Sequence, residues 1–248
     1  MSKQTILLID AHPIWRQGVM SLIKHEADLE ICGQTNNFGE AVDLAGLLKP
    51  DLIILDIAHD EGQALEFIKR VGAENPGTAI LVLSLNDERL FAERTVRAGA
   101  RGYLMKQESG DVLIMAVRQV LRGGVYLSAR MRDFLLSRSL GPELERSEPD
   151  PGWLSDREIQ VFTLLGSGKA NKEIARLMNV SVKTIDAYRA HIKQKLRLRS
   201  GLELFRLAVL YAQPDAAGGG VSGRHARSLF ESASAHRSKH QEVGVEVP

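Results

Sequence analysis

The chain has 248 residues, of which 44% are hydrophobic and 25% are charged. These values are typical of globular proteins, exclude a fibrous repeat or a chain disordered throughout, and at this length favour two domains. No apolar run reaches the roughly 18 residues that a membrane span needs, the start lacks the apolar region of a secretory signal, and one cysteine, Cys32, cannot build a disulfide framework, so we expect a cytoplasmic protein with no membrane partner.

The net charge of +1 hides an uneven distribution along the chain. Residues 1–123 carry 13 Lys and Arg against 17 Asp and Glu, whereas residues 153–212 carry 11 against 5. An acidic first half followed by a compact basic segment predicts a regulatory domain joined to a domain that binds a polyanion.

Residues 1–123 alternate short apolar runs with segments of helical periodicity. We expect strands at 5–10, 29–34, 51–56, 79–84 and 101–105. We expect helices at 14–25, 38–48, 62–73, 87–99 and 110–123. Near-continuous hydrophobic strands alternating with helices predict an α/β fold with a doubly wound, five-stranded parallel sheet covered on both faces.

Four chemically active side chains follow the predicted strands at one edge of this sheet. They are Asp10, Asp56, Ser84 and Lys106. Ligands of open α/β sheets bind at the carboxyl ends of the strands, so we expect these groups to converge. The set suits acceptance of a phosphoryl group: one carboxylate as nucleophile, another to hold a divalent cation, and the hydroxyl and ammonium to bind phosphoryl oxygens.

The middle and the end of the chain change in composition. A short helix near 128–137 precedes a linker, Ser139–Gly152, that is rich in Pro, Glu and Ser. Residues 213–248 are dominated by Ala, Gly, Ser and His and hold few apolar residues, so we expect a disordered tail. The predicted division is therefore 1–123, 124–152, 153–212 and 213–248.

Residues 153–212 have the pattern of four helices. Capping-box spacing at Ser155 with Glu158, and at Ser200 with Glu203, marks two helix starts. A second helix is expected near 172–178 after an Asn171 cap, and a third after the tight turn at 179–181.

The third helix of this segment has the features of a helix that enters the major groove. Val182, Ile185, Tyr188, Ile192 and Leu196 are expected to face inward. The opposite side and its rim supply the predicted DNA-binding residues, namely Lys172, Lys183, Thr184, Asp186, Ala187, Arg189, Ala190, Lys193 and Lys195. Small residues permit close approach, Asp186 can accept from cytosine, and the cations can bind phosphates.

The last helix, near 201–212, is apolar on nearly every side. We expect Leu202, Phe205 and Val209 to fill the core and Leu204, Ala208 and Tyr211 to lie exposed. An exposed apolar stripe favours pairing with a second copy, so a homodimer on DNA is predicted.

Several motifs resemble a known family over about residues 5–212. LLIDAHPIWRQGV, PDLIILD, LVLSLNDE and RAGARGYLMK resemble the receiver domain of a bacterial response regulator. The segment LSDREIQVFTLLGSGKANKEIARLMNVSVKTIDAYRAHIKQKL resembles a LuxR-type helix-turn-helix, and the order of the two is similar to that of the NarL/FixJ class. The resemblance implies a flavodoxin-like receiver followed by an all-α four-helix DNA-binding domain.

The resemblance also assigns roles to residues of the first domain. It implies Asp56 as phosphoacceptor, Ser84 and Tyr103 as the switch pair, and Lys106 as the phosphate-sensing cation. It implies Mg²⁺ held by Asp10, Asp56 and the backbone of Ala58.

The sequence departs from the family pattern on both sides of this site. Ala11 stands where the family has a second acidic residue, and 58–62 (AHDEG) replaces the usual Pro-Gly turn after the acceptor. The first change removes a metal ligand, so we expect a weakened Mg²⁺ site, with Asp60 as a candidate substitute. His12 and His59 are interpreted as polar loop residues.

The sequence therefore predicts a two-component transcriptional regulator, not an enzyme, in which phosphorylation of Asp56 controls DNA binding. The expected partners are double-stranded DNA, a sensor histidine kinase, a second copy of the chain and, as a further candidate, RNA polymerase. Two alternatives remain open: a phosphorylation-independent pseudo-receiver, and a regulator that binds protein instead of DNA. A flavin or nucleotide enzyme of the same fold is a third, which the lack of a glycine-rich loop after the first strand disfavours.

Overall fold

The computed structural model describes residues 3–57, 61–140 and 150–212. The chain divides into two compact units. Of the described residues, Pro151–Gln160 belong with the first unit, and Asp150 belongs with residues 161–212 in the second. Across the described ranges, none of the helices has the length and apolar content needed to cross a membrane.

The first unit is built on a five-stranded parallel sheet with the order β2-β1-β3-β4-β5. The strands are β1 (Gln4–Ile9), β2 (Leu29–Thr35), β3 (Leu52–Leu55), β4 (Ala79–Ser84) and β5 (Gly102–Met105). This order is that of flavodoxin-like proteins, in which the strand order reverses beside β1 and leaves a crevice at the carboxyl ends of β1 and β3. The predicted doubly wound sheet is confirmed.

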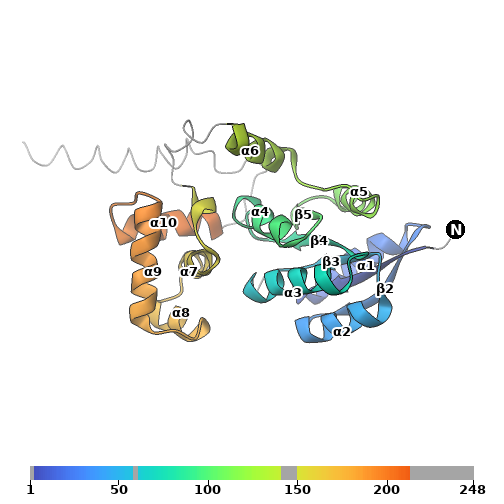
Figure 1. Ribbon diagram of the computed structural model, residues 1–248, viewed down its shortest axis with the longest axis horizontal. Coiled ribbons are helices and arrows are strands. Elements are labelled where there is room, and N and C mark those ends of the chain that lie inside the picture. The colour runs from blue at the N-terminus through green and yellow to red at the C-terminus, as the bar shows by residue number, and fades with distance from the viewer. Residues whose placement is uncertain (1–2, 58–60, 141–149, 213–248) are drawn as a thin grey trace, which may run out of the picture. The chain divides into compact units, whose positions relative to one another are not determined.

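Helices cover both faces of the sheet (Figure 1). They are α1 (Pro13–Lys24), α2 (Phe38–Leu48), α3 (Glu61–Glu74), α4 (Glu88–Ala98) and α5 (Gly110–Leu121). α2, α3 and α4 follow one another along one face, and α1 and α5 pack together on the other. All four residues of β3 are fully buried, which is why the sequence of this strand is apolar without alternation.

A short segment after α5 extends the sheet edge. Tyr126 forms a parallel bridge with Gly102, and its backbone carbonyl accepts from the Tyr103 amide at 3.0 Å. A Cβ on Gly102 would lie 3.0 Å from the Tyr126 carbonyl oxygen, so this close approach requires glycine. The segment therefore covers the free edge of β5.

Helix α6 (Ala129–Leu140) follows and is longer than predicted, because it continues through Ser139 and Leu140, where we expected the linker to begin. Met131 of α6 is fully buried, and α6 packs against α4. Ser128 caps the helix through the Met131 amide and donates to the Glu88 carboxylate at 2.8 Å. The rest of the predicted linker up to residue 149, and the predicted tail, lie outside the described residues.

The second part of the chain is helical, as predicted. A 3-10 turn, Pro151–Trp153, precedes α7 (Asp156–Gly166), α8 (Asn171–Leu177), α9 (Val182–Lys195) and α10 (Gly201–Ala212). Phe162 of α7 is fully buried and stacks edge-on against Tyr211 of α10, with ring centroids 5.9 Å apart. A Cβ at Gly166 would overlap the Ala208 carbonyl, so α7 and α10 approach closely there.

The predicted capping boxes are present in different degrees. The Glu158 carboxylate accepts from the Ser155 amide at 2.7 Å, and the Ser155 hydroxyl caps the Glu158 amide. Ser200 caps the Glu203 amide, but the Glu203 carboxylate accepts from the amide of Arg199 instead of Ser200. Asn179, in the turn between α8 and α9, adopts the predicted left-handed conformation with φ of 54°.

Candidate functional site

The strand ends of the first unit bring together three charged side chains that the sequence placed there. Asp10 follows β1, Asp56 follows β3 and Lys106 follows β5, and each is at most 6% exposed. The Lys106 Nζ lies 2.7 Å from Asp10 Oδ2 and 3.0 Å from Asp56 Oδ2. Buried charges are tolerated when they are paired, and here one ammonium is shared by two carboxylates.

The loop after β1 and the first turn of α1 add three side chains to this cluster that the sequence analysis did not place there. The Trp15 ring centroid lies 5.5 Å from Lys106 Nζ, within the range of a cation–π contact. Arg16 donates to the Asp10 backbone carbonyl at 2.6 Å and so fixes the loop from the first turn of α1. The third side chain is His12.

His12 contacts both carboxylates of the cluster, whereas we interpreted it as a polar loop residue. Its Nδ1 lies 3.2 Å from Asp10 Oδ1 and 3.2 Å from Asp56 Oδ2. The signal in the sequence was its position, two residues after Asp10 in the same short loop; a lone histidine in a loop gave no reason to choose it.

The electrostatics of the cluster set the state of the acceptor. Burial raises the pKa of the Asp56 carboxyl above its ordinary value, and the neighbouring negative charge of Asp10 adds to the rise. The Lys106 ammonium opposes both because it favours the charged carboxylate. A net negative charge remains when two ionised carboxylates face one ammonium, so the cluster attracts a further cation.

The residues that could hold that cation include the predicted Asp10 and Asp56 and add His12. Asp10, His12 and Asp56 each offer one ligand atom, and these atoms lie within 4.8 Å of one another. The donor set fits a divalent cation. Ala11 is exposed and offers no side-chain ligand, as predicted. Ala58, His59 and Asp60 lie outside the described residues.

The predicted switch pair is joined through a residue that the sequence analysis missed. Ser84 is fully buried, and its hydroxyl accepts from the Asn86 amide at 3.0 Å. Tyr103 is 1% exposed and donates its hydroxyl to the Asn86 carbonyl at 2.8 Å. Asn86 therefore connects the ends of β4 and β5, and no motif in the sequence marked it.

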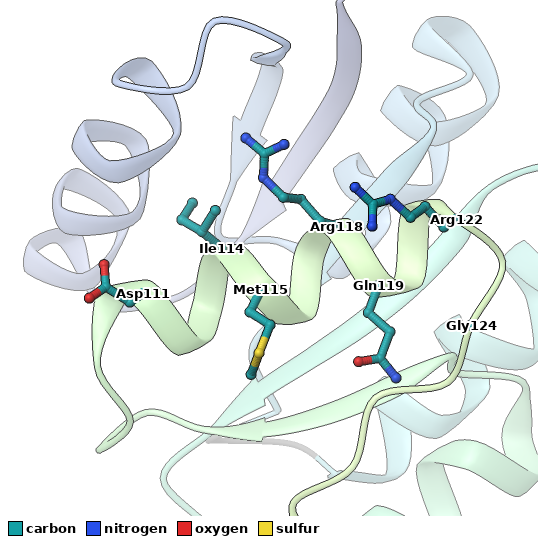
Figure 2. A pocket seen from close by; sticks show the side chains of 7 residues that line it. All are labelled: Asp111, Ile114, Met115, Arg118, Gln119, Arg122 and Gly124. Carbon is teal, nitrogen blue, oxygen red and sulfur yellow. The ribbon is translucent and has the colours of Figure 1, made fainter.

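A pocket along α5 contains none of these residues. Figure 2 shows its lining side chains, which come from α5 and the turn after it. They are Asp111, Ile114, Met115, Arg118, Gln119, Arg122 and Gly124. Arg118 forms ion pairs with Glu26 at 2.5 Å and Asp28 at 2.8 Å, which fasten α5 to the end of α1. We assign no chemistry to this pocket.

In the helical part, α9 presents most of the predicted residues to solvent. Lys183, Asp186, Ala187 and Ala190 are exposed, and so are Lys172 on α8 and Lys195 at the end of α9. Thr184, Arg189 and Lys193 are half-buried. Ile185, Ile192 and Leu196 are buried as predicted and Tyr188 is half-buried, but Val182 is 39% exposed, because it is the first residue of α9 and lies beyond the core.

Asn171 does not cap α8 as predicted. The helix begins one residue earlier, after Ala170, whose amide is capped by the Glu173 carboxylate at 2.9 Å. As the first helical residue, Asn171 reaches α9 instead: it donates to Asp186 at 2.7 Å and accepts from Arg189 at 2.6 Å. This amide thereby fixes two of the predicted DNA-binding side chains.

The predicted faces of α10 are wrong. Leu204, Leu207 and Ala208 are buried, whereas Leu202 is 58% exposed and Phe205 is 42% exposed. The close contact between α10 and α7 at Ala208 sets this rotation, which a uniformly apolar helix cannot reveal by periodicity. An exposed apolar stripe exists, but it consists of Leu202 and Phe205.

Comparison with known proteins defines the class. Residues 6–118 match the response regulator receiver domain family, and residues 153–208 match the bacterial regulatory proteins of the luxR family. The chain is 32% identical to the oxygen regulatory protein NreC of Staphylococcus carnosus over 82% of this chain and 96% of that protein. The chain belongs to the response regulators of the NarL/FixJ type, with a receiver domain and a LuxR-type helix-turn-helix.

The particular relatives agree with this class. NreC of Staphylococcus epidermidis is 31% identical over 82% of this chain and 96% of that protein. Among solved structures, the RcsB response regulator of Salmonella typhimurium has a TM-score of 0.64 at 20% identity, covering 84% of this chain and 98% of that one. RcsB of Salmonella enterica bound to promoter rprA in the presence of a phosphomimetic has a TM-score of 0.61 at 20% identity, covering 84% and 99%. These structures support the fold.

Proposed function

We propose that this protein is a transcriptional regulator whose receiver accepts a phosphoryl group on Asp56 and whose helix α9 binds double-stranded DNA. The observation that carries the proposal is the convergence of Asp10, Asp56 and Lys106 at the strand ends, with Lys106 3.0 Å from Asp56 Oδ2. The four segments predicted from the sequence serve as its domain division, with residues 1–123 as the receiver and 153–212 as the DNA-binding domain.

The chemistry follows from these groups. A carboxylate oxygen of Asp56 attacks phosphorus, a P–O bond forms, and the P–N bond of a phosphohistidine donor on a sensor kinase breaks. The leaving imidazole keeps the electron pair and takes up a proton. Lys106 then pairs with the phosphoryl oxygens. Asp10 stays ionised beside them as the second carboxylate of the site. Asp10 and Asp56 would hold a divalent cation such as Mg²⁺, which when bound would screen the charges of the nucleophile and the phosphoryl group.

The connection to the second domain runs through the β4–α4 loop. Ser84 and Tyr103 both form hydrogen bonds with the Asn86 backbone. A phosphoryl group that binds the Ser84 hydroxyl would compete with the bond from the Asn86 amide and so change how this loop is held. Glu88 follows two residues later and accepts from Ser128, which caps α6. A change at Asp56 would therefore reach α6, the helix that precedes the DNA-binding domain in the chain. The route would follow the backbone from Asn86 to Glu88 and then the hydrogen bonds of Ser128 with Glu88 and Met131.

In the second domain, α9 would lie in the major groove. Ala187 and Ala190 permit close approach, and Lys183 and Lys195 would bind phosphates. Asp186 keeps one oxygen for a base amino group while the other accepts from Asn171. The Leu202 and Phe205 stripe would pair two copies on inverted half-sites, in the way that RcsB occurs as dimers bound to DNA. We place the protein in the cytoplasm, with RNA polymerase as a further partner.

The alternative is a receiver that works without phosphorylation. Lys106 already lies between the two carboxylates, and Ala11 lacks the family's second acid, so the resting cluster is partly neutralised. In that case the protein would regulate transcription by binding DNA without phosphorylation of Asp56.

The test is labelling of the full chain with a small-molecule phosphodonor, read by intact mass. Wild type should gain one phosphoryl group at elevated Mg²⁺, and Asp56→Asn should gain none. Asp51→Asn is a matched control, because Asp51 is exposed, lies before β3 and should leave labelling unchanged. Absence of labelling at every Mg²⁺ concentration would support the phosphorylation-independent alternative.

A further inference from the structure

We propose that His12 is a metal ligand, and that the receiver site of this chain consequently prefers a first-row transition-metal ion over Mg²⁺. The proposal rests on the receiver function above and concerns which ion the site takes.

The backbone places the His12 side chain in the cluster. His12 precedes Pro13, which disfavours helical geometry, and has extended dihedral angles, φ −95° and ψ 110°. It occupies the N-cap position of α1, where a polar side chain ordinarily caps an amide, yet its side chain forms no capping bond. The ring instead faces Asp10 and Asp56.

Two of the three distances between the donor atoms fit one ion, and all three atoms lie within 4.8 Å of one another. Ligand atoms bound at 2.0–2.2 Å and separated by angles of 90–110° lie about 2.8–3.6 Å apart. His12 Nδ1 lies 3.2 Å from an oxygen of each carboxylate. The Asp10 oxygen concerned is Oδ1, which also accepts from the His12 backbone amide at 2.7 Å, whereas Lys106 pairs with Oδ2. The Asp56 oxygen concerned is Oδ2, which Lys106 Nζ also contacts at 3.0 Å, and Nζ lies 3.5 Å from His12 Nδ1, so a bound ion would share Asp56 Oδ2 with Lys106.

Charge and ligand chemistry then decide the kind of ion. Two carboxylates offset by one ammonium leave little charge for Mg²⁺, which relies on oxygen ligands and binds nitrogen poorly. An imidazole nitrogen is a good ligand for Co²⁺, Ni²⁺, Zn²⁺ or Fe²⁺ and needs no negative charge to bind. Replacement of the family's second acid by Ala11 together with an inward His12 exchanges an oxygen ligand for a nitrogen ligand.

The experiment measures Co²⁺ and Mg²⁺ binding to the full chain by isothermal titration calorimetry, with X-ray absorption of the Co²⁺ complex to count bound imidazoles. His225, His236 and His240 are changed to Ala in every protein, so that the histidines of residues 213–248 add no signal. Thermal unfolding confirms that each variant is folded. Phosphodonor labelling is not used, so failure of the proposed phosphorylation leaves this result interpretable.

We expect one imidazole on Co²⁺ in the parent protein. His12→Ala should weaken Co²⁺ binding by at least about tenfold and remove the imidazole signal, while Mg²⁺ affinity stays within about threefold. His25→Ala is the matched control, because His25 bonds the Ser21 carbonyl away from the cluster and should change nothing. Ala11→Asp should raise Mg²⁺ affinity and narrow the preference for Co²⁺.

Two results overturn the proposal. One is a parent Co²⁺ complex without any imidazole, which does not depend on a variant folding. The other is an imidazole signal that survives His12→Ala and disappears in His59→Ala, which would assign the nitrogen to the loop after the acceptor.

Discussion

The strand-end cluster and the α9 surface both offer cations to phosphate, but the cation of the cluster is buried and paired whereas those of α9 are exposed. In the cluster, one fully buried ammonium is held by two carboxylates whose positions are set by a parallel sheet. On α9, Lys183 and Lys195 are exposed, and Asn171 bonds the side chains of Asp186 and Arg189. A site for one small group is therefore preorganised, whereas a site for a long polyanion relies on the number of its cations.

This contrast predicts the largest stability effect in the cluster. Lys106→Ala removes the shared cation and leaves two buried carboxylates facing each other, which should cost about 3–5 kcal/mol. Lys183→Ala on the exposed face should change stability by no more than about 0.5 kcal/mol. Denaturant unfolding of both variants measures the difference, and equal midpoints would show that Lys106 is not held by the two carboxylates.

The exposed and buried faces of α10 make a second, sharper comparison within one helix. Leu204→Ala should destabilise the domain by about 2–5 kcal/mol because Leu204 is fully buried. Leu202→Glu with Phe205→Glu should leave the fold intact and abolish paired occupancy of DNA. Thermal unfolding and footprinting report the two effects. Paired footprints that survive the double change would remove this stripe from the dimer interface.

The sequence predicts the features that the topology of the fold determines, but not those that depend on individual contacts. The alternation of buried strands and amphipathic helices predicts the sheet, and the strand ends locate Asp10, Asp56 and Lys106, because topology alone brings them together. The rotation of α10 could not be predicted, since it depends on the close contact of Gly166 with Ala208. The roles of His12 and Asn171 depend on side-chain direction, and the role of Asn86 depends on where its backbone N–H and carbonyl lie. Spacing in the sequence specifies neither.

The salt dependence of DNA binding tests the α9 surface. If Lys183 neutralises one phosphate, Lys183→Ala should weaken binding to every duplex and reduce the slope of log K against log salt by about 1. Asn171→Ala should leave the slope nearly unchanged while relaxing sequence choice, because it frees Asp186 and Arg189. Fluorescence anisotropy over a salt series checks both. A slope identical to wild type in Lys183→Ala would place that lysine away from DNA.

The smallest effect is expected at Glu88, the first residue of α4. Burial raises the pKa of this carboxyl above its ordinary value, while the Ser128 hydroxyl and the Arg130 charge oppose the rise. A raised pKa means that the fold favours the protonated form, so this contribution to stability is complete below the ordinary pKa and is lost as pH rises through the raised value. Glu88→Gln should therefore raise the unfolding midpoint slightly at neutral pH and flatten its pH dependence. A lower midpoint that follows pH as in wild type would contradict this.

Phosphorylation of Asp56 in the buried strand-end cluster is expected to control DNA binding by the exposed α9 surface. The direct measurement is the affinity of the full chain for a duplex selected from a random pool, before and after stoichiometric phosphorylation confirmed by mass. We expect phosphorylation to tighten binding by about 5–150-fold, the range of ordinary coupling between sites, and Asp56→Asn to show no change under the same treatment. Equal affinity of the phosphorylated and unphosphorylated protein would contradict the account.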